Sequence, residues 1–254
     1  MKLLFIGDVV GDVGCRFLQQ RLPGLKRELG VDMTVVNGEN SANGNGITEY
    51  SANQLFRAGA DVITTGNHAF QRRTELHVYE NECILRPANH SDACPGHGVT
   101  IYDMGASRAA IINLQGVLFL ESLDNPFDKI DALLKSIDTP NIFVDFHAEA
   151  TSEKRALGHY LAGRVTAVMG THTHVQTADA CILSGHTGYI TDVGMTGVED
   201  SVLGVDKKIA VDRMHLHVPI RFEEAKGACY LNGVLIEYEK KCGKCTKITP
   251  LIVR

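Results

Sequence analysis

The stretch RVTAVMGTHTH, residues 164–174, is an apolar run that ends abruptly in glycine, threonine and histidine. Short, nearly continuous apolar runs bounded in this way are typical of strands that are buried on both faces. The same pattern recurs along the chain, with an apolar run leading directly into polar residues. The other examples are LLFI into GD at 7–8, MTVV into NGEN at 37–40, DVITT into GNH at 66–68, NIFVDF into HAEA at 147–150 and YITDV into GMTG at 194–197. The repetition predicts the strands of an open α/β sheet.

Between several of these strands, apolar residues recur at helical spacing. The segments 18–29, 127–137 and 152–162 show this period, and Asn125-Pro126 is a typical helix start. The C-terminal part reads differently, because MHLHVPIRF, 214–222, alternates and predicts a half-exposed strand. Asn232-Gly233 further predicts the turn of a hairpin. We therefore expect an α/β fold with antiparallel strands near its end, in a single domain over residues 1–254.

Composition narrows the classes of function. Hydrophobic residues make up 44% of the 254 residues, which is enough for a sizeable core. No apolar run approaches the roughly 18 residues of a membrane span, and Asp8 interrupts the first apolar stretch too early for a signal peptide. The formal charge of −5, without a basic block, argues against binding of duplex nucleic acid. Seven cysteines, an odd number, favour reduced thiols and a cytoplasmic location.

Polar side chains gather where the predicted strands end. Ligands of open α/β sheets bind beyond the carboxyl ends of the strands. The residues delivered there are Asp8, Glu39, Asn40, Asn67, His68, His147, His172 and His174. Two carboxylates at one edge would repel each other, and would repel a phosphate, unless a cation lay between them. Because residues i and i+2 of an extended segment point the same way, His172 and His174 would form one side of a metal site.

Each of these features also has an ordinary structural explanation when it is taken alone. Asp8 could cap the following helix, Glu39 and Asn40 could be turn residues, and an isolated pair of histidines is more often structural. His215 and His217 provide an internal comparison, because they have the same spacing but fall on the polar face of the predicted strand 214–222. We interpret that pair as solvated. The recurrence of polar residues at the ends of five strands is what favours a metal site over the separate explanations.

The motifs GDVVG, VNGENSANGNGIT, TGNHAF, DFHAEATSEK, GTHTHVQTAD and YITDVGMTG resemble those of the calcineurin-like metallophosphoesterases, and in detail the YmdB-like branch. The resemblance covers most of residues 1–205. Val10 stands where the wider superfamily has a first histidine, Glu39 replaces its bridging Asp, and Ala69 replaces the acidic residue after GNH. The resemblance implies a four-layer αββα sandwich with two metal ions. It also implies a phosphodiesterase of 2′,3′-cyclic nucleotides, acting through a metal-bridging hydroxide.

Carried over residue by residue, the resemblance assigns Asp8, Glu39, Asn40 and His174 to one metal. It assigns Glu39, Asn67, His147 and His172 to the other, with Glu39 bridging. Oxygen and imidazole ligands without thiolate suit iron, manganese or zinc, and the resemblance favours iron or manganese over zinc or magnesium. His68 is expected to donate a proton to the leaving alkoxide. The substrate-binding residues are not identified by the sequence.

Other functions and features stay open at this stage. A phosphomonoesterase or nucleotidase could use the same site, and a nucleotide-binding regulatory protein with weak catalysis is an alternative from another class. The resemblance also implies a homo-oligomer and links to proteins of RNA metabolism. Cys242 and Cys245 form a CxxC near an expected turn. A reduced pair is the preferred interpretation, with a labile disulfide or a zinc site shared between subunits as the alternatives.

Overall fold

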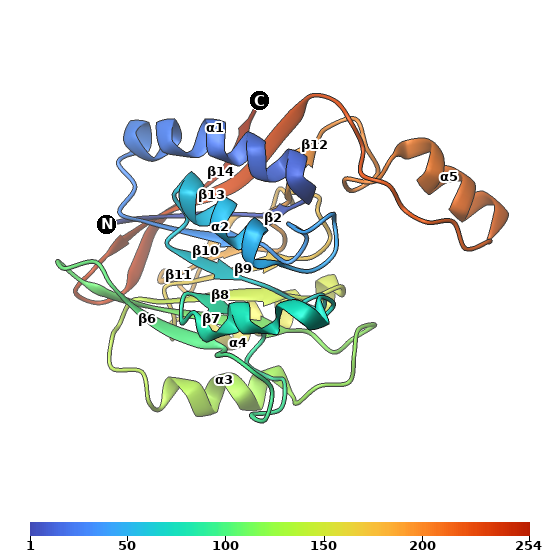
Figure 1. Ribbon diagram of the computed structural model, residues 1–254. Helices are drawn as coiled ribbons and strands as arrows, with labels where there is room; N and C mark the ends of the chain where they lie inside the picture. Colours follow the sequence, from blue (N-terminus) through green and yellow to red (C-terminus); the bar gives the residue numbers. More distant parts are fainter.

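Two β-sheets pack face to face in the computed structural model, which describes residues 1–254, and helices cover their outer faces (Figure 1). The first sheet has eight strands: β1 (Lys2–Ile6), β2 (Asp8–Val9), β3 (Met33–Asn37), β4 (Val62–Thr64), β5 (Ile84–Leu85), β12 (Met195–Val198), β13 (Cys229–Glu239) and β14 (Lys244–Val253). The second has six: β6 (Val99–Asp103), β7 (Arg108–Gln115), β8 (Ile142–His147), β9 (Ala167–Thr171), β10 (Cys181–Leu183) and β11 (Thr187–Ile190).

The helices complete the layers. They are α1 (Gly11–Leu29), α2 (Glu49–Ala58), the 3-10 helix η1 (Arg73–Glu80), α3 (Pro126–Leu134), α4 (Thr151–Leu161) and α5 (Lys207–Leu216). In Figure 1, α1 and α2 lie over the first sheet, α3 and α4 lie on the side of the second sheet, and α5 projects from the body on an arm. The expected four-layer αββα sandwich is therefore confirmed, as are the helices expected within 18–29, 127–137 and 152–162. No helix combines the length and the apolarity needed to cross a membrane.

The continuous apolar run of β1 is explained by its position between two hydrophobic layers. Successive side chains of a strand point to opposite faces of the sheet. Leu3 and Phe5 enter the cluster between the two sheets, whereas Leu4 and Ile6 pack in the cluster under α1 and α2. A third cluster fills the space between the second sheet and the helices α3 and α4. Both faces of β1 are thus buried, and no polar alternation appears in its sequence.

Each sheet contains a block of four parallel strands, flanked by antiparallel ones. In the first sheet β1, β3, β4 and β5 are paired in parallel, and in the second sheet β7, β8, β9 and β11 are. Parallel strands place their carboxyl ends at one edge of a sheet. The turns after β1, β3, β4, β8 and β9 therefore supply the polar residues that converge between the two layers.

A buried carboxylate ties the two sheets together. Asp145 of β8 accepts hydrogen bonds from Asn37 Nδ2 (3.0 Å) and Thr64 Oγ1 (2.5 Å), both in the first sheet. It also accepts one from Thr171 Oγ1 (2.7 Å), in the second sheet. Such hydrogen bonds are needed here, because a buried carboxylate without partners is strongly unfavourable.

Two expectations for the C-terminal part are wrong. Residues 214–222 do not form a strand: α5 extends through Leu216, and its N-terminus is capped by Asp206, whose carboxylate accepts from Lys208 N and Ile209 N. The segment projects into solvent, so no core selects one periodicity of its apolar residues over another. His215 and His217 are nevertheless exposed, as predicted.

Asn232-Gly233 does not form a turn, because both residues lie inside β13. Gly233 is required by a close approach, since a Cβ there would lie 3.0 Å from the Phe5 carbonyl oxygen. The hairpin turn comes later, between β13 and β14, where Gly243 has φ +71°. Cys242 lies in this turn and is exposed, whereas Cys245 is buried in β14, and both are free thiols.

The Asp145 network predicts a pH-dependent contribution to stability. Burial raises the pKa of the Asp145 carboxyl to about 6, although His147 and the hydrogen bonds from Thr64, Thr171 and Asn37 oppose the rise. The folded chain thus holds this proton more tightly than the unfolded chain. Its contribution to stability is full below about pH 4, and is lost as the pH rises through the folded pKa of about 6.

Chelator-treated wild type and Asp145→Asn are to be unfolded in urea across this range. We expect the stability of the wild type, relative to the variant, to fall by on the order of 3 kcal/mol between about pH 4 and about pH 6. Parallel stability curves for the two proteins would contradict the raised pKa.

Candidate metal centre

The structure brings the eight sequence-predicted residues into one region, between the two sheets. Asp8 begins β2, directly after β1, and His147 is the last residue of β8. The others lie in the turns that follow strands: Glu39 and Asn40 after β3, Asn67 and His68 after β4, and His172 and His174 after β9. Asp8, Glu39, Asn40, His147 and His174 are buried.

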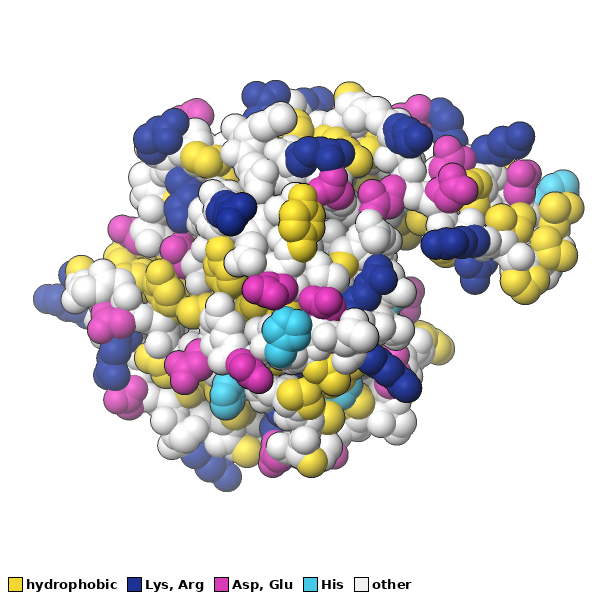
Figure 2. Space-filling view, in the orientation of Figure 1, with side chains coloured by type: hydrophobic (Ala, Val, Ile, Leu, Met, Phe, Trp, Pro, Cys, Tyr) yellow, Lys and Arg dark blue, Asp and Glu magenta, His cyan; other side chains and the backbone are white.

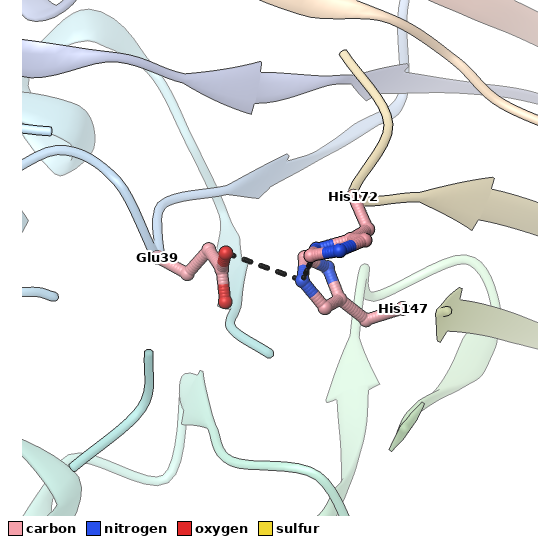
Figure 3. A group of neighbouring side chains, drawn as sticks. All are labelled: Glu39, His147 and His172. Atoms are coloured by element: carbon pink, nitrogen blue, oxygen red, sulfur yellow. Dashed lines mark hydrogen bonds and ion pairs between the residues drawn. The ribbon is translucent and has the colours of Figure 1, made fainter. Parts of the chain in front are cut away.

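Three potential ligand atoms crowd around one nitrogen of His147. Its Nε2 lies 3.0 Å from Asn67 Oδ1, 3.2 Å from Glu39 Oε1 and 3.1 Å from His172 Nδ1. Figure 3 shows Glu39 and the two histidines pointing toward one another. A single imidazole N–H cannot serve three such neighbours. A cation shared by the four groups would satisfy all of them, and Glu39, His147 and His172 offer ligand atoms within 4.8 Å of one another.

A second group lies around Asp8. His174 Nε2 is 3.5 Å from Asp8 Oδ1 and 3.2 Å from Asn40 Nδ2. Asp8 Oδ1 is buried and has no hydrogen-bond partner, which is costly for a carboxylate oxygen. His174 Nδ1–H donates to the carbonyl of Leu203 at 3.1 Å, so Nε2 presents its lone pair to Asp8 and Asn40. An unsatisfied oxygen beside an available nitrogen suits a cation.

Glu39 connects the two groups. Its Oε1 is 3.2 Å from His147 Nε2 and accepts from Asn40 Nδ2 at 3.2 Å, while its Oε2 accepts from the backbone N–H of His68 at 3.1 Å. The His68 ring donates from Nδ1 to Asn40 Oδ1 at 2.8 Å. The side chain of His68 is 31% exposed. It therefore stands at the accessible side of the cluster rather than inside it.

The electrostatics of the cluster follow from its burial. Burial alone would raise the pKa of Glu39, but His147 and His68 outweigh it and hold that pKa well below its usual range. Burial would likewise raise the pKa of Asp8, but His174 and His147 outweigh it and lower that pKa. Burial would lower the pKa of His147, but Glu39, Asp8 and Asp145 outweigh it and raise that pKa to about 9. Both carboxylates are therefore ionised near neutral pH and pair with the neighbouring histidines.

A hydrogen-bond chain orients His147. Thr171 Oγ1 donates to Asp145 Oδ1 at 2.7 Å, and the same hydroxyl lies 2.9 Å from His147 Nδ1. Because the hydroxyl proton is used toward Asp145, Thr171 accepts from His147 Nδ1–H. Nε2 is then left to face Asn67 and Glu39. Outer partners of this kind fix the tautomer and the ring orientation of metal-ligating histidines.

The segment that carries His172 and His174 is strained and is held by a buried ion pair. Both histidines have positive φ, +101° and +63°, which costs of order 1–3 kcal/mol each. Asp192 Oδ2 accepts from the backbone N–H (3.0 Å) and the hydroxyl (2.7 Å) of Thr173. Lys154 of α4 pairs with the same oxygen at 2.7 Å, and both charged side chains are buried. The pair thereby holds the turn between the two histidines.

Removal of Lys154 should loosen this turn. In Lys154→Met the Asp192 carboxylate stays buried without its cation, so we expect a loss of about 3–5 kcal/mol in the free energy of unfolding. We also expect metal affinity to fall by ~10–100-fold, because the histidines lose their support. Urea unfolding and metal titration of the chelated protein measure the two effects.

Arg155→Met is the matched control on the same helix. Arg155 pairs with Asp179 at 3.4 Å, and both side chains are partly exposed. Its removal should cost about 1 kcal/mol and leave metal affinity unchanged. Equal effects of the two substitutions on metal affinity would refute the special role of Lys154.

Sequence reasoning missed the residues that support the cluster. Asp145 and Asp192 had a visible signal, because each is a carboxylate inside an apolar strand segment, in NIFVDF and YITDV. Glu149 lies 2.9 Å from His172 Nε2, through its Oε2, and orients that ring from the outer side. The contact between His174 and the Leu203 carbonyl could not be predicted from the sequence, because every residue has a backbone carbonyl.

The face-to-face sheets, with carboxylate, amide and imidazole groups at the carboxyl ends of their strands, define a protein of the metallophosphoesterase type. Solved structures agree. A protein from Thermus thermophilus has a TM-score of 0.95 at 37% identity, over 99% of this chain and 98% of its own. A phosphatase from Mycoplasma pneumoniae has a TM-score of 0.95 at 32% identity, over 100% of this chain and 93% of its own.

The family model for YmdB-like protein matches residues 4–251, and the chain belongs to this family. A curated relative from Bacillus subtilis (strain 168) is 46% identical over 257 residues, which cover 100% of this chain and 97% of the relative. That relative is named 2′,3′-cyclic-nucleotide 2′-phosphodiesterase.

Proposed function

We propose that this protein is a dinuclear metal-dependent phosphodiesterase that hydrolyses 2′,3′-cyclic nucleotides. The observation that carries the proposal is the pair of ligand groups around His147 and Asp8, joined through the buried carboxylate of Glu39. The activity in the name of the Bacillus subtilis relative, 46% identical over the whole chain, supports the choice of substrate.

The residues fit two divalent cations. One would be held by Asp8, Glu39, Asn40 and His174, and the other by Glu39, Asn67, His147 and His172. The unsatisfied Asp8 Oδ1 and the three neighbours of His147 Nε2 support this division. When bound, such cations supply Lewis-acid activation of water and neutralise charge on the phosphate.

Asn40 couples the ligand set to His68. An amide coordinates metal through oxygen, so Asn40 would bind with its Oδ1 and Nδ2 positions exchanged relative to those in the structure. Nδ2 would then face His68 Nδ1, which lies 2.8 Å from the Asn40 amide, and would donate to it. The ring proton of His68 would consequently reside on Nε2. From its partly exposed position, Nε2–H can donate a hydrogen bond to the leaving alkoxide of the opened ring and stabilise its charge.

His68→Ala should separate chemistry from metal binding. His68 is not among the proposed ligands, so we expect two metals per chain to remain bound, while kcat for 2′,3′-cyclic AMP falls by ~10²–10⁴-fold. Metal analysis and steady-state kinetics on the same preparation give the two values. Full turnover by the metal-loaded variant would refute the role of His68 at the leaving alkoxide.

Glu39→Gln tests the bridge. The amide keeps the shape of the side chain but removes the negative charge that both proposed metal positions share. We expect the second equivalent of metal to be lost from the purified variant, and turnover with it. Retention of both metals and of full activity would rule out the bridging role.

A comparison of substrates separates the diesterase from its alternatives. Metal-loaded protein should open 2′,3′-cyclic AMP and release little phosphate from adenosine monophosphates. Preferential hydrolysis of the monoesters would favour a phosphomonoesterase or nucleotidase. Tight binding of the cyclic nucleotide without hydrolysis would favour a regulatory binding protein.

We extend the proposal to the metal, the location and the assembly. Iron or manganese is preferred because the proposed ligands are carboxylate, amide and imidazole, without thiolate. Seven free cysteines favour the cytoplasm. Exposed apolar side chains on the arm of α5, among them Val211, Met214 and Phe222, favour a homo-oligomer (Figure 2). Links to RNA-metabolism proteins rest on the family resemblance alone.

A further inference from the structure

A cavity of about 450 Å³ lies away from the metal centre, between the segment that follows β5 and the helix α3. It shares no lining residue with the proposed metal ligands. Its polar lining includes Arg86, Asp92, Cys94, His97 and Lys129, and its apolar lining includes Ala88, Val99 and Leu133. Cationic side chains thus outnumber the single carboxylate in the wall.

Arg86 is the unusual member of this wall. The residue is only 5% exposed, yet its guanidinium has no carboxylate within ion-pair distance. Nη1 donates to the carbonyls of Pro87 (3.0 Å) and Ala88 (3.3 Å), whereas the buried Nε has no acceptor. A buried cation without a counter-charge is strongly unfavourable, and the two carbonyl oxygens satisfy only part of this guanidinium.

The neighbouring charges do not neutralise Arg86. Asp92 pairs with Lys129 at 2.8 Å and its side chain is 88% exposed, so this carboxylate belongs to the rim of the cavity. His97 adds a further nitrogen at the exposed side. An anion that enters the cavity would therefore meet the unpaired positive charge of Arg86.

The walls of the cavity are built from rigid backbone. The Arg86 backbone N–H donates to the His97 carbonyl at 3.0 Å, and the Asn113 backbone bonds both Ala88 and Gly98. A Cβ at Gly98 would lie 2.3 Å from the Ala88 Cα, so only glycine allows the two segments to approach this closely. These contacts fix the part of the wall formed by Arg86, Ala88 and Gly98.

We propose that this cavity binds the phosphate group of a small phosphorylated molecule, with Arg86 as the principal ligand and Lys129 and His97 as further contacts. A guanidinium fork matches the tetrahedral oxygens of phosphate, and phosphate carries the charge that the wall lacks. The volume exceeds that of orthophosphate, so it also accommodates a phosphate monoester. The site does not depend on the proposed phosphodiesterase activity.

Binding is to be measured on chelator-treated full-length protein, so that phosphate cannot bind through metal ions. The Tm is followed as sodium phosphate replaces sodium chloride at constant ionic strength. We expect phosphate to raise the Tm of the wild type. In Arg86→Met the apparent Kd for phosphate should weaken about tenfold or more, because charge-assisted hydrogen bonds are lost.

Arg86→Met makes a second prediction that loss of folding would not imitate. Without phosphate, removal of an unpaired buried charge should leave the Tm unchanged or raise it. Arg108→Met removes an exposed arginine, paired with Asp138 at 3.1 Å, and should leave phosphate binding intact. If Arg86→Met is insoluble, Lys129→Ala replaces it, with Lys135→Ala beyond the end of α3 as its control.

AMP and acetate complete the experiment. Tighter binding of AMP than of orthophosphate would assign the cavity to a monoester, and equal binding would assign it to phosphate alone. Acetate should not raise the Tm. An equal phosphate response of wild type, Arg86→Met and Lys129→Ala would overturn the proposal, as would an equal response to acetate.

Discussion

The face-to-face packing of two mixed sheets is the constraint on which this structure depends. The layer between them is apolar along most of its area, with Leu3, Phe5 and their neighbours facing the second sheet. At the carboxyl edge it becomes polar, and there Asp145 links β3, β4, β8 and β9 through three hydrogen bonds. The Asp145 carboxylate can be buried at this edge because these hydrogen bonds supply its partners.

The same constraint explains why segments far apart in the sequence meet. Asp8 and His174 are separated by most of the chain, yet they approach within 3.5 Å because β1 and β9 end at neighbouring positions of the two sheets. The Lys154–Asp192 pair and the Asp145–Thr171 chain then hold the histidines from outside the cluster. Their effect is to present ring nitrogens inward in a fixed orientation, as metal sites require.

The sequence predicted the strands, the central helices and the candidate ligands because burial on both faces leaves an unambiguous pattern. The apolar run of β1 ends shortly before Asp8, and β9 ends immediately before His172. The ends of these strands could therefore be predicted from the sequence. Where the chain leaves the core, the pattern of apolar residues no longer predicts the secondary structure. Residues 214–222 are mostly exposed, and their alternation reflected no buried face. Asn232-Gly233 has turn composition, but the close approach of Phe5 to Gly233 decides its conformation, and only the tertiary structure shows that approach.

Some buried charged groups have partners within the protein, and others do not. Asp145 and the Lys154–Asp192 pair have complete sets of partners within the protein. Asp8 lacks a partner for one oxygen, and Arg86 lacks an acceptor for its Nε. These two exceptions have opposite charge and lie in different places. We interpret the first as a place for a cation, and the second as a place for an anion.

Anomalous diffraction from crystals grown with manganese tests the central claim most directly, because it locates each cation without reference to activity. The account predicts two peaks per chain. One should lie among Asp8, Asn40 and His174, and the other among Asn67, His147 and His172, with Glu39 between them. A single peak, or peaks remote from Glu39, would contradict the assignment of a dinuclear centre to this edge of the sheets.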